Sequence, residues 1–425
     1  MRWEQKIQFA TLTDVGLRRQ NNEDSSAVAL AGTDDEFLKR GHLFLVADGM
    51  GGHAVGELAS KIAAETVPHT YLKHPEGDVR IALQSAVLSA NAAIHTRGEQ
   101  NHDFQRMGTT CSTLVLTENG AYVAHVGDSR VYRVRRDRID QLSFDHSLHW
   151  ELQRRDQRLA KQIDLSAHKN VITRCLGPEA NVMIDLEGPH PILPGDAYVL
   201  CSDGLSNQLS DEEIGAIVRE LSANAACRLL VDMANARGGP DNCTVIVAKI
   251  GDLPANVPPP PVPVDYAPPS LGWAWLFGFW AVAMVLIWGL SLMYFGHPWP
   301  GIFITAMAGF GGVAMLLAAF RQRRHLRGGG EDDASRTNLS RPHRTAVGLD
   351  SRQLFDTLIE TEGELRRSAM EDGWEVDWKA HGEIMKAAAQ CRSENRCGRA
   401  CREVGKAIEL LMSQLPSTAS RTAKR

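Results

Sequence analysis

A short apolar run near the start of this chain ends on an aspartate and is followed by glycines. Leu43–Ala47 reads as a buried strand, and LVADGMGGH continues it through Asp48 to Gly49, Gly51 and Gly52. A carboxylate is costly to bury without a partner. The glycines leave the backbone free to approach the same point. The arrangement therefore predicts a functional site built around Asp48.

Similar arrangements recur in the first 250 residues. YVLCSDG places Asp203 and a glycine after another apolar run, and GGPDNCTVIV places Asp241 just before one. AHVGDSR contributes Asp128, and GLRRQNNED contributes Glu23 and Asp24. One Asp-Gly pair is weak evidence because turns favour both residues. Together, however, carboxylates without histidine or thiolate form the ligand set of Mg²⁺ or Mn²⁺.

Residues 1–251 mix β-rich runs with amphipathic helical stretches. The runs follow one another by hairpins, such as the ENG turn at 118–120, which favours antiparallel sheets covered by helices over repeated βαβ units. The predicted fold class is therefore α+β. The predicted strands are Ile7–Leu12, Leu43–Ala47, Ser112–Leu116, Ala121–Val126, Val131–Arg135, Ala197–Cys201 and Cys243–Ile250.

Composition limits the functional classes. The chain has 425 residues, room for two or three domains, and a formal charge of −5, which gives no reason to expect nucleic-acid binding. Its eight cysteines lack a disulfide or zinc pattern and favour a reducing compartment. We predict that Cys391, Cys397 and Cys401 lie on one helix as packing residues. The N-terminus has no apolar run long enough for a secretory signal.

Between Tyr266 and Phe320 there is no Asp, Glu, Lys or Arg. Residues 271–295 and 301–320 are each about as long as a membrane span, roughly 20 residues. The arginine-rich stretch 321–327 follows and favours a cytoplasmic position. We therefore expect a two-helix hairpin in the inner membrane, in contact with lipid, with both soluble parts cytoplasmic. The alternative is a pair of buried core helices.

The remaining segments complete the predicted organisation. Residues 252–270 are a proline-rich linker, and 321–349 are a basic and then flexible linker. Residues 350–415 show helical spacing and predict a small helical segment. That segment either binds a partner or itself, or is a solvated helix pair.

Residues 7–250 resemble the protein phosphatase 2C family of metal-dependent serine/threonine phosphatases, in its bacterial form. The matching motifs, in family order, are TDVGLRRQNNEDS, VADGMGGHAVGELAS, GTTCSTLVL, VGDSRVYR, DHSLHWEL, NVITRCLG, LCSDGL and DNCTVIV. The resemblance implies two antiparallel β-sheets sandwiched between helices (αββα), with the metal site in a cleft at one edge.

The resemblance also implies roles for individual residues. Asp48 would bridge two Mn²⁺ or Mg²⁺ ions, the Gly49 carbonyl would bind one of them, and Asp203 with Asp241 would complete the other. Asp128 would hold a third, weaker ion. The residues expected around the metals are Glu23, Asp24 and Asn242. Arg19 corresponds to the arginine that binds the substrate phosphate, since a planar guanidinium suits bidentate phosphate recognition.

Two positions depart from the family pattern. Met50 stands where many eukaryotic members carry a histidine that could protonate the leaving group, and His53 cannot be assumed to replace it. His125 stands where bacterial members often have asparagine, and we interpret it as a neighbour without a catalytic role. Residues 145–169 correspond to the family's variable flap, which either selects substrates or is simply solvated.

The predicted function is a membrane-tethered phosphatase that hydrolyses phosphoserine and phosphothreonine in proteins by a metal-bridged hydroxide and opposes a bacterial serine/threonine kinase. The alternative is a catalytically silent, phosphatase-like binding or sensory module. A thiol-based phosphatase needs a cysteine six residues before an arginine, and none of the eight cysteines has that spacing.

Overall fold

The computed structural model describes residues 7–52, 54–101, 104, 106–148, 150–151, 171–251, 273–309, 311–312 and 342–415. The chain divides into two compact units. One contains Met1–Val257 together with Ser340–Arg425, and the other contains Pro258–Leu339. The C-terminal residues therefore belong to the same unit as the N-terminal ones.

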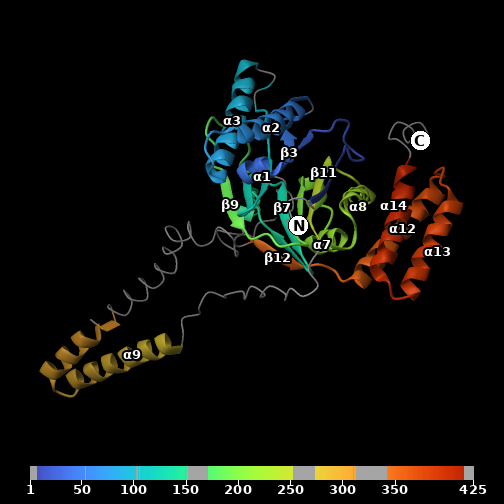
Figure 1. Cartoon of the computed structure of the whole chain (residues 1–425). Helices are drawn as coiled ribbons and strands as arrows, with labels where there is room; N and C mark the ends of the chain where they lie inside the picture. The colour runs from blue at the N-terminus through green and yellow to red at the C-terminus, as the bar shows by residue number, and fades with distance from the viewer. Residues whose placement is uncertain are drawn as a thin grey trace. The chain divides into compact units, whose positions relative to one another are not determined.

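Two antiparallel sheets form the centre of the first unit (Figure 1). Sheet A has the order β1 (Ile7–Asp14), β11 (Cys243–Ile250), β10 (Ala197–Cys201), β7 (Arg130–Arg135), β8 (Arg138–Gln141) and β12 (Arg344–Val347). Sheet B has the order β2 (Asp24–Ala29), β3 (His42–Met50), β5 (Cys111–Thr117), β6 (Gly120–Val126) and β9 (Asp185–His190), and the short β4 (Gly108–Thr109) pairs with β3. The α+β fold with two antiparallel sheets and helices is confirmed.

The apolar run in β3 is continuous because both faces of that strand are buried. Phe44 and Val46 pack in the core between the sheets, together with Leu200 of sheet A. Leu43 and Leu45 point the other way, into a second core formed with α2 and α3. Alternate side chains of a strand point to opposite faces, so a strand between two apolar layers needs no polar positions.

Helices cover the outer faces of the two sheets. Sheet B is covered by α2 (Ala54–Lys73) and α3 (Val79–Gln100), and sheet A by α7 (Asp211–Glu220) and α8 (Ala223–Ala236). The shorter helices are α1 (Asp34–Arg40) and α6 (Asp203–Ser206). At the start of α7, Ser210 and Glu213 form a capping box that satisfies two free backbone N–H groups.

The C-terminal segment packs on the same side as α7 and α8. β12 pairs with β8 and becomes the sixth strand of sheet A, within a stretch that the sequence predicts to be a flexible linker. Three helices follow, α12 (Ser351–Glu371), α13 (Trp378–Ser393) and α14 (Cys397–Ser413). Leu358 and Ile408 are fully buried in one apolar core with residues of α8, and α14 lies beside α8 in Figure 1.

One prediction for this segment is wrong. Cys391 lies on α13, whereas Cys397 and Cys401 lie on α14, so the three cysteines do not share a helix. The helix that begins after Cys391 is separate because α13 ends at Ser393 and the chain turns through Asn395 with a positive φ of 59°. All eight cysteines are free thiols.

The second unit contains α9 (Trp273–Tyr294) and a helix over 298–309. Among the described residues, none of the helices has both the length and the apolar character that membrane crossing requires. The prediction of a two-span inner-membrane protein is therefore wrong.

Candidate functional site

The predicted aspartates lie where strands of both sheets begin or end. Asp24 begins β2 and is the direct cross-strand partner of Asp48 on β3. Asp203 follows β10, Asp128 precedes β7, and Asp241 precedes β11. Each lies in or beside a different strand, so the sheets bring together residues that are up to about 200 positions apart in the sequence.

Their electrostatic interaction shows how close these carboxylates are. Burial raises the pKa of Asp48 well above its usual range, and the carboxylates of Asp24, Asp203, Asp128 and Asp241 raise it further. Burial also raises the pKa of Asp24 to about 7 and that of Asp203 to about 6. The pKa of Asp128 is raised well above its usual range, by burial and then by Asp203. Both causes penalise the charged form.

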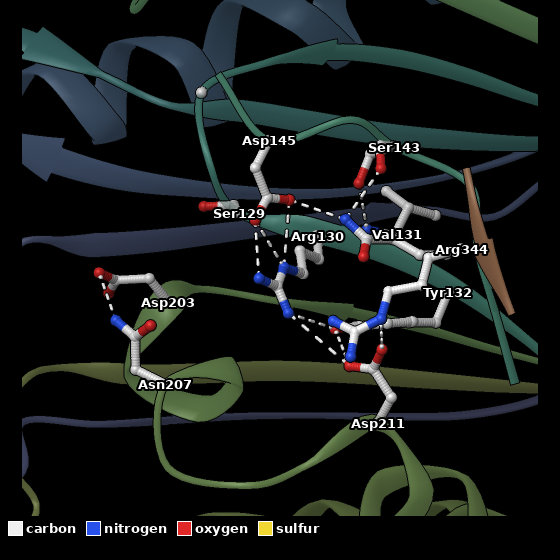
Figure 2. Close-up of polar contacts among 12 residues, drawn as sticks. Ser129, Arg130, Val131, Tyr132, Ser143, Asp145, Asp203, Asn207, Asp211 and Arg344 are labelled. Carbon is white, nitrogen blue, oxygen red and sulfur yellow. Dashed lines mark hydrogen bonds and ion pairs between the residues drawn. The ribbon is translucent and has the colours of Figure 1, made fainter. Parts of the chain in front are cut away.

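Three oxygens in this cluster are buried without a hydrogen-bond partner, namely Oδ1 of Asp24, Asp128 and Asp203. The second oxygen of Asp24 accepts a hydrogen bond of 2.8 Å from Ser202. That of Asp203 accepts one of 3.1 Å from Asn207, as Figure 2 shows. Unpartnered, buried carboxylate oxygens fit hard divalent cations. Within the described ranges, however, no group of three or more His, Cys, Asp or Glu side chains is placed so that it could hold a metal ion.

The backbone around Asp48 is fixed by close contacts. The Asp48 amide donates to the Thr110 hydroxyl at 2.8 Å, and the Asp48 carbonyl accepts from the Thr110 amide at 2.9 Å. A Cβ on Gly49 would lie 2.1 Å from the carbonyl oxygen of Gly56 on α2. A residue with a side chain cannot occupy this position unless α2 moves, so Gly49 is required for the end of β3 to pack here.

Glu23 and Asn242 connect the loop before β2 to the start of β11. The Asn242 side chain accepts from the Glu23 amide at 2.8 Å and donates to the carbonyl groups of Val15 and Asn21 at 2.9 and 3.0 Å. The Glu23 carbonyl in turn accepts from the Gly49 amide at 3.1 Å. Because its side chain is used in these contacts, Asn242 holds the loop in place.

Arg19 lies at the solvent side of the cluster. Its guanidinium forms an ion pair of 2.8 Å with Asp241, and about half of its side chain is exposed. Exposure leaves the remaining N–H groups available to a ligand. The structure therefore brings Arg19, Asp24, Asp48, Asp128, Asp203 and Asp241 into one site, with Gly49, Glu23 and Asn242 supporting it.

Arg130 is a residue of the site that the sequence analysis missed. It forms an ion pair of 2.7 Å with Asp145, donates to the Tyr132 hydroxyl and lies 3.7 Å from Asp211 (Figure 2). Its positive charge opposes the rise in the pKa of Asp128 and Asp203. Arg130 is visible in the motif VGDSRVYR, but its partners lie elsewhere in the sequence.

The same network extends to the C-terminal segment. Arg344 of β12 lies 3.3 Å from the second oxygen of Asp211, so two arginines share this carboxylate (Figure 2). Asp211 is almost fully buried, and its hydrogen bond from Tyr132 is 2.9 Å long. Strand β12 therefore reaches the ionic network that lies next to the aspartates.

His125 and Met50 are the two positions that depart from the family pattern. His125 is fully buried, and it contacts the Ser112 hydroxyl and the Gly127 carbonyl, both at 2.9 Å. Burial, with His146, lowers its pKa to about 3, so its ring is neutral and supports the turn before Asp128. Met50 ends β3. His53 and residues 152–169 of the predicted flap lie outside the described residues.

Comparison with known proteins gives consistent matches over this region. A family model described as protein phosphatase 2C matches residues 20–236. The serine/threonine protein phosphatase PstP of Mycobacterium tuberculosis is 34% identical over 247 residues, which are 58% of this chain and 45% of the relative. A putative protein phosphatase 2C-type of Streptococcus pyogenes is 35% identical over 244 residues, 56% of this chain and 96% of the relative.

Solved structures match the same part of the chain. The crystal structure of M. tuberculosis PstP/Ppp has a TM-score of 0.50 and 34% identity, and covers 58% of this chain and 99% of that one. The PstP catalytic domain in complex with two manganese ions has a TM-score of 0.49 and 35% identity, with the same coverage. The match to the full-length PstP of M. tuberculosis, in contrast, spans less than half the length of that relative.

Proposed function

This chain belongs to the protein phosphatase 2C family of metal-dependent serine/threonine phosphatases, and on that basis we propose that it removes phosphate from phosphoserine and phosphothreonine in proteins. The enzymes of this family use Mn²⁺ or Mg²⁺ as cofactors. We propose further that its activity opposes a bacterial serine/threonine kinase, because the substrates of a protein phosphatase are produced by such a kinase.

The observation that carries the proposal is the set of buried carboxylate oxygens without partners at one end of the two sheets. Asp48, Asp203 and Asp241, with the Gly49 carbonyl, would hold two divalent cations, and Asp128 would hold a third, weaker one. Glu23 and Asp24 would accept hydrogen bonds from waters at the edge of this site. When bound, two divalent cations acidify a water nucleophile and offset negative charge on a phosphoryl group.

The protein groups around the site orient the substrate. Arg19 would exchange its ion pair with Asp241 for the phosphate oxygens, which accept two parallel hydrogen bonds from a guanidinium. The backbone of Asp48 is held by Thr110 and by its pairing with Asp24, which fixes the point from which its carboxylate extends. Asn242 keeps the Arg19 loop in contact with the start of β11.

The test is phosphate release from a phosphothreonine peptide by the full-length protein. We expect turnover with Mn²⁺ and none in chelator. Turnover that continues in chelator would contradict a metal-dependent hydrolase. Metal binding and peptide binding without any turnover would instead support a silent binding module.

A further inference from the structure

A pocket of about 960 Å³ lies at the end of sheet A opposite the aspartates. β7 and β11 begin beside the aspartates and end at this pocket, whereas β1 and β10 begin at the pocket and end beside the aspartates. Seven residues of extended strand separate Asn242 from Lys249, a distance of roughly 23 Å. The pocket is therefore distinct from the site described above.

The pocket is formed by both parts of the first unit. Strand ends and the junction between α7 and α8 supply most of its walls. α14 supplies Arg402, Gly405, Lys406 and Glu409. The site is incomplete without the C-terminal helices.

The carboxylates of the pocket are already paired. Asp196 forms an ion pair of 2.7 Å with Arg135, and Glu220 forms one of 3.0 Å with Arg219. Glu409 pairs with Arg228 on α8. Lys406 pairs with Glu403 at 2.8 Å. None of these ion pairs includes Arg136, Lys249 or Arg402, which are the remaining cations of the pocket.

Two of those cations interact with the end of α7. Lys249 donates to the Leu221 carbonyl, and the Nε of Arg402 donates to the Glu220 carbonyl at 3.2 Å. Cations are favourable at a helix C-terminus. Each contact uses only one donor, while a lysine has three and an arginine five. Burial and the charge of Arg402 lower the pKa of Lys249 to about 8, as expected for two cations held close together.

Arg136 is the third cation. It lies in the turn between β7 and β8 with a positive φ of 58°, and among the described residues its side chain has no hydrogen-bond or ion-pair partner. An unpaired arginine in the same pocket as Lys249 and Arg402 gives the pocket a local excess of positive charge.

We propose that this pocket binds a small phosphate-bearing molecule through Arg136, Lys249 and Arg402. Its volume is within the range of small-molecule sites, about 300–1,000 Å³. Arginine and lysine form charge-assisted hydrogen bonds with phosphate. Because α14 carries Arg402, the bound molecule also stabilises the docking of the C-terminal helices.

The test is calorimetric titration of the full-length protein with inorganic pyrophosphate in chelator, which excludes divalent cations. We expect saturable binding that Arg136→Gln and Arg402→Gln each weaken at least tenfold. Arg367→Gln, an exposed arginine of α12 outside the pocket, is the matched control and should bind like the parent. Lys249→Arg should retain binding, because it keeps the charge.

The Arg19→Ala variant distinguishes binding in the pocket from binding beside the aspartates, because pyrophosphate bound beside the aspartates would be lost in this variant. We expect its binding to equal that of the parent. The proposal would be overturned if the Arg136→Gln and Arg402→Gln proteins bound pyrophosphate as tightly as the parent. It would also be overturned if the parent showed no saturable binding at millimolar pyrophosphate. Binding of a phosphothreonine peptide, but not of pyrophosphate, through the same residues would overturn it as well. The readout is binding, so it is independent of whether the protein is a phosphatase.

Discussion

The two ends of the paired sheets differ in charge: buried carboxylates gather at one end, and cations without a carboxylate partner gather at the other. At the first end, burial and neighbouring carboxylates raise the pKa of Asp48, Asp128 and Asp203. At the other end, burial and Arg402 lower the pKa of Lys249. Both shifts favour the neutral form, since burial and like charges destabilise the charged one. An oppositely charged ligand relieves this cost at either end.

The two ends differ in which parts of the chain they need. The aspartates come from strand ends of the first 250 residues. The cationic pocket also needs α14, which lies outside the residues 20–236 matched by the family model. Asp24, Asp48, Asp128 and Asp203 lie within the matched residues, and Arg19 and Asp241 lie within five residues of their ends, whereas α14 begins more than 150 residues beyond them.

The largest effect should follow from Asp48→Asn. A neutral amide cannot offset two cations, and one positioned electrostatic group is worth roughly 10²–10³ in rate. We expect kcat on a phosphothreonine peptide to fall by at least that factor. Asp35→Asn, on the exposed face of α1, is the control and should match the parent. An Asp48→Asn protein within tenfold of the parent would contradict the role given to this residue.

Arg19→Ala should have a smaller effect, mainly on KM. Hydrogen bonds to charged groups contribute about 1.5–3 kcal/mol, so we expect KM for the phosphopeptide to rise about tenfold or more. Metal affinity should not fall, because the change removes a cation that competes for Asp241. Arg18→Ala is the matched neighbour for steady-state kinetics and calorimetry. Weaker metal binding with unchanged KM would place Arg19 in a structural role.

Asp128→Ala should lower turnover without removing the main metal sites. If Asp128 holds a third, weaker ion, calorimetry should still detect two tight Mn²⁺ sites, with kcat reduced several-fold. Asp203→Asn is the comparison and should weaken tight binding itself. Loss of both tight sites in the Asp128→Ala protein would show that this aspartate belongs to the main metal site.

The sequence allowed the acidic end to be predicted because each aspartate lies beside an apolar run or a glycine-bearing turn. The predicted strand Ala197–Cys201 was correct to the residue, and Leu43–Ala47 lies inside β3. β12 was not predicted, since RTAV is short and polar and becomes a strand only by pairing with β8.

The cationic end could not be predicted from the sequence. Arg136, Lys249 and Arg402 come from a hairpin turn, a strand end and a C-terminal helix, and only tertiary contacts bring them together. Arg130 was missed for the same reason. The uncharged stretch between Tyr266 and Phe320 predicted two membrane helices, but none of the helices among the described residues has the length and apolar character of a span.

The smallest effect should be a pH dependence at the junction between α8 and α14. Burial raises the pKa of Asp232 on α8 to about 7, and the carboxylates of Glu409 and Asp14 raise it further, while Arg228 opposes them. The pKa of Asp232 in the folded protein is above its unfolded value of 3.8. The stability that the protonated carboxyl group contributes is therefore fully present at pH values below 3.8. It is lost as pH rises through about 7.

We therefore expect the Tm of the parent to fall from acidic to mildly basic pH, by roughly 2–4 °C for each kcal/mol lost. Asp232→Asn keeps the shape of the side chain without the charge and should give a flatter profile. Without metal, the aspartates around Asp48 act in the same direction, so the slopes of the two proteins are compared with each other in chelator. Asp137→Asn, in the exposed β7–β8 turn, is the control and should retain the parent's slope. Identical slopes in the parent and the Asp232→Asn protein would show that the α8–α14 junction does not respond to pH through this carboxylate.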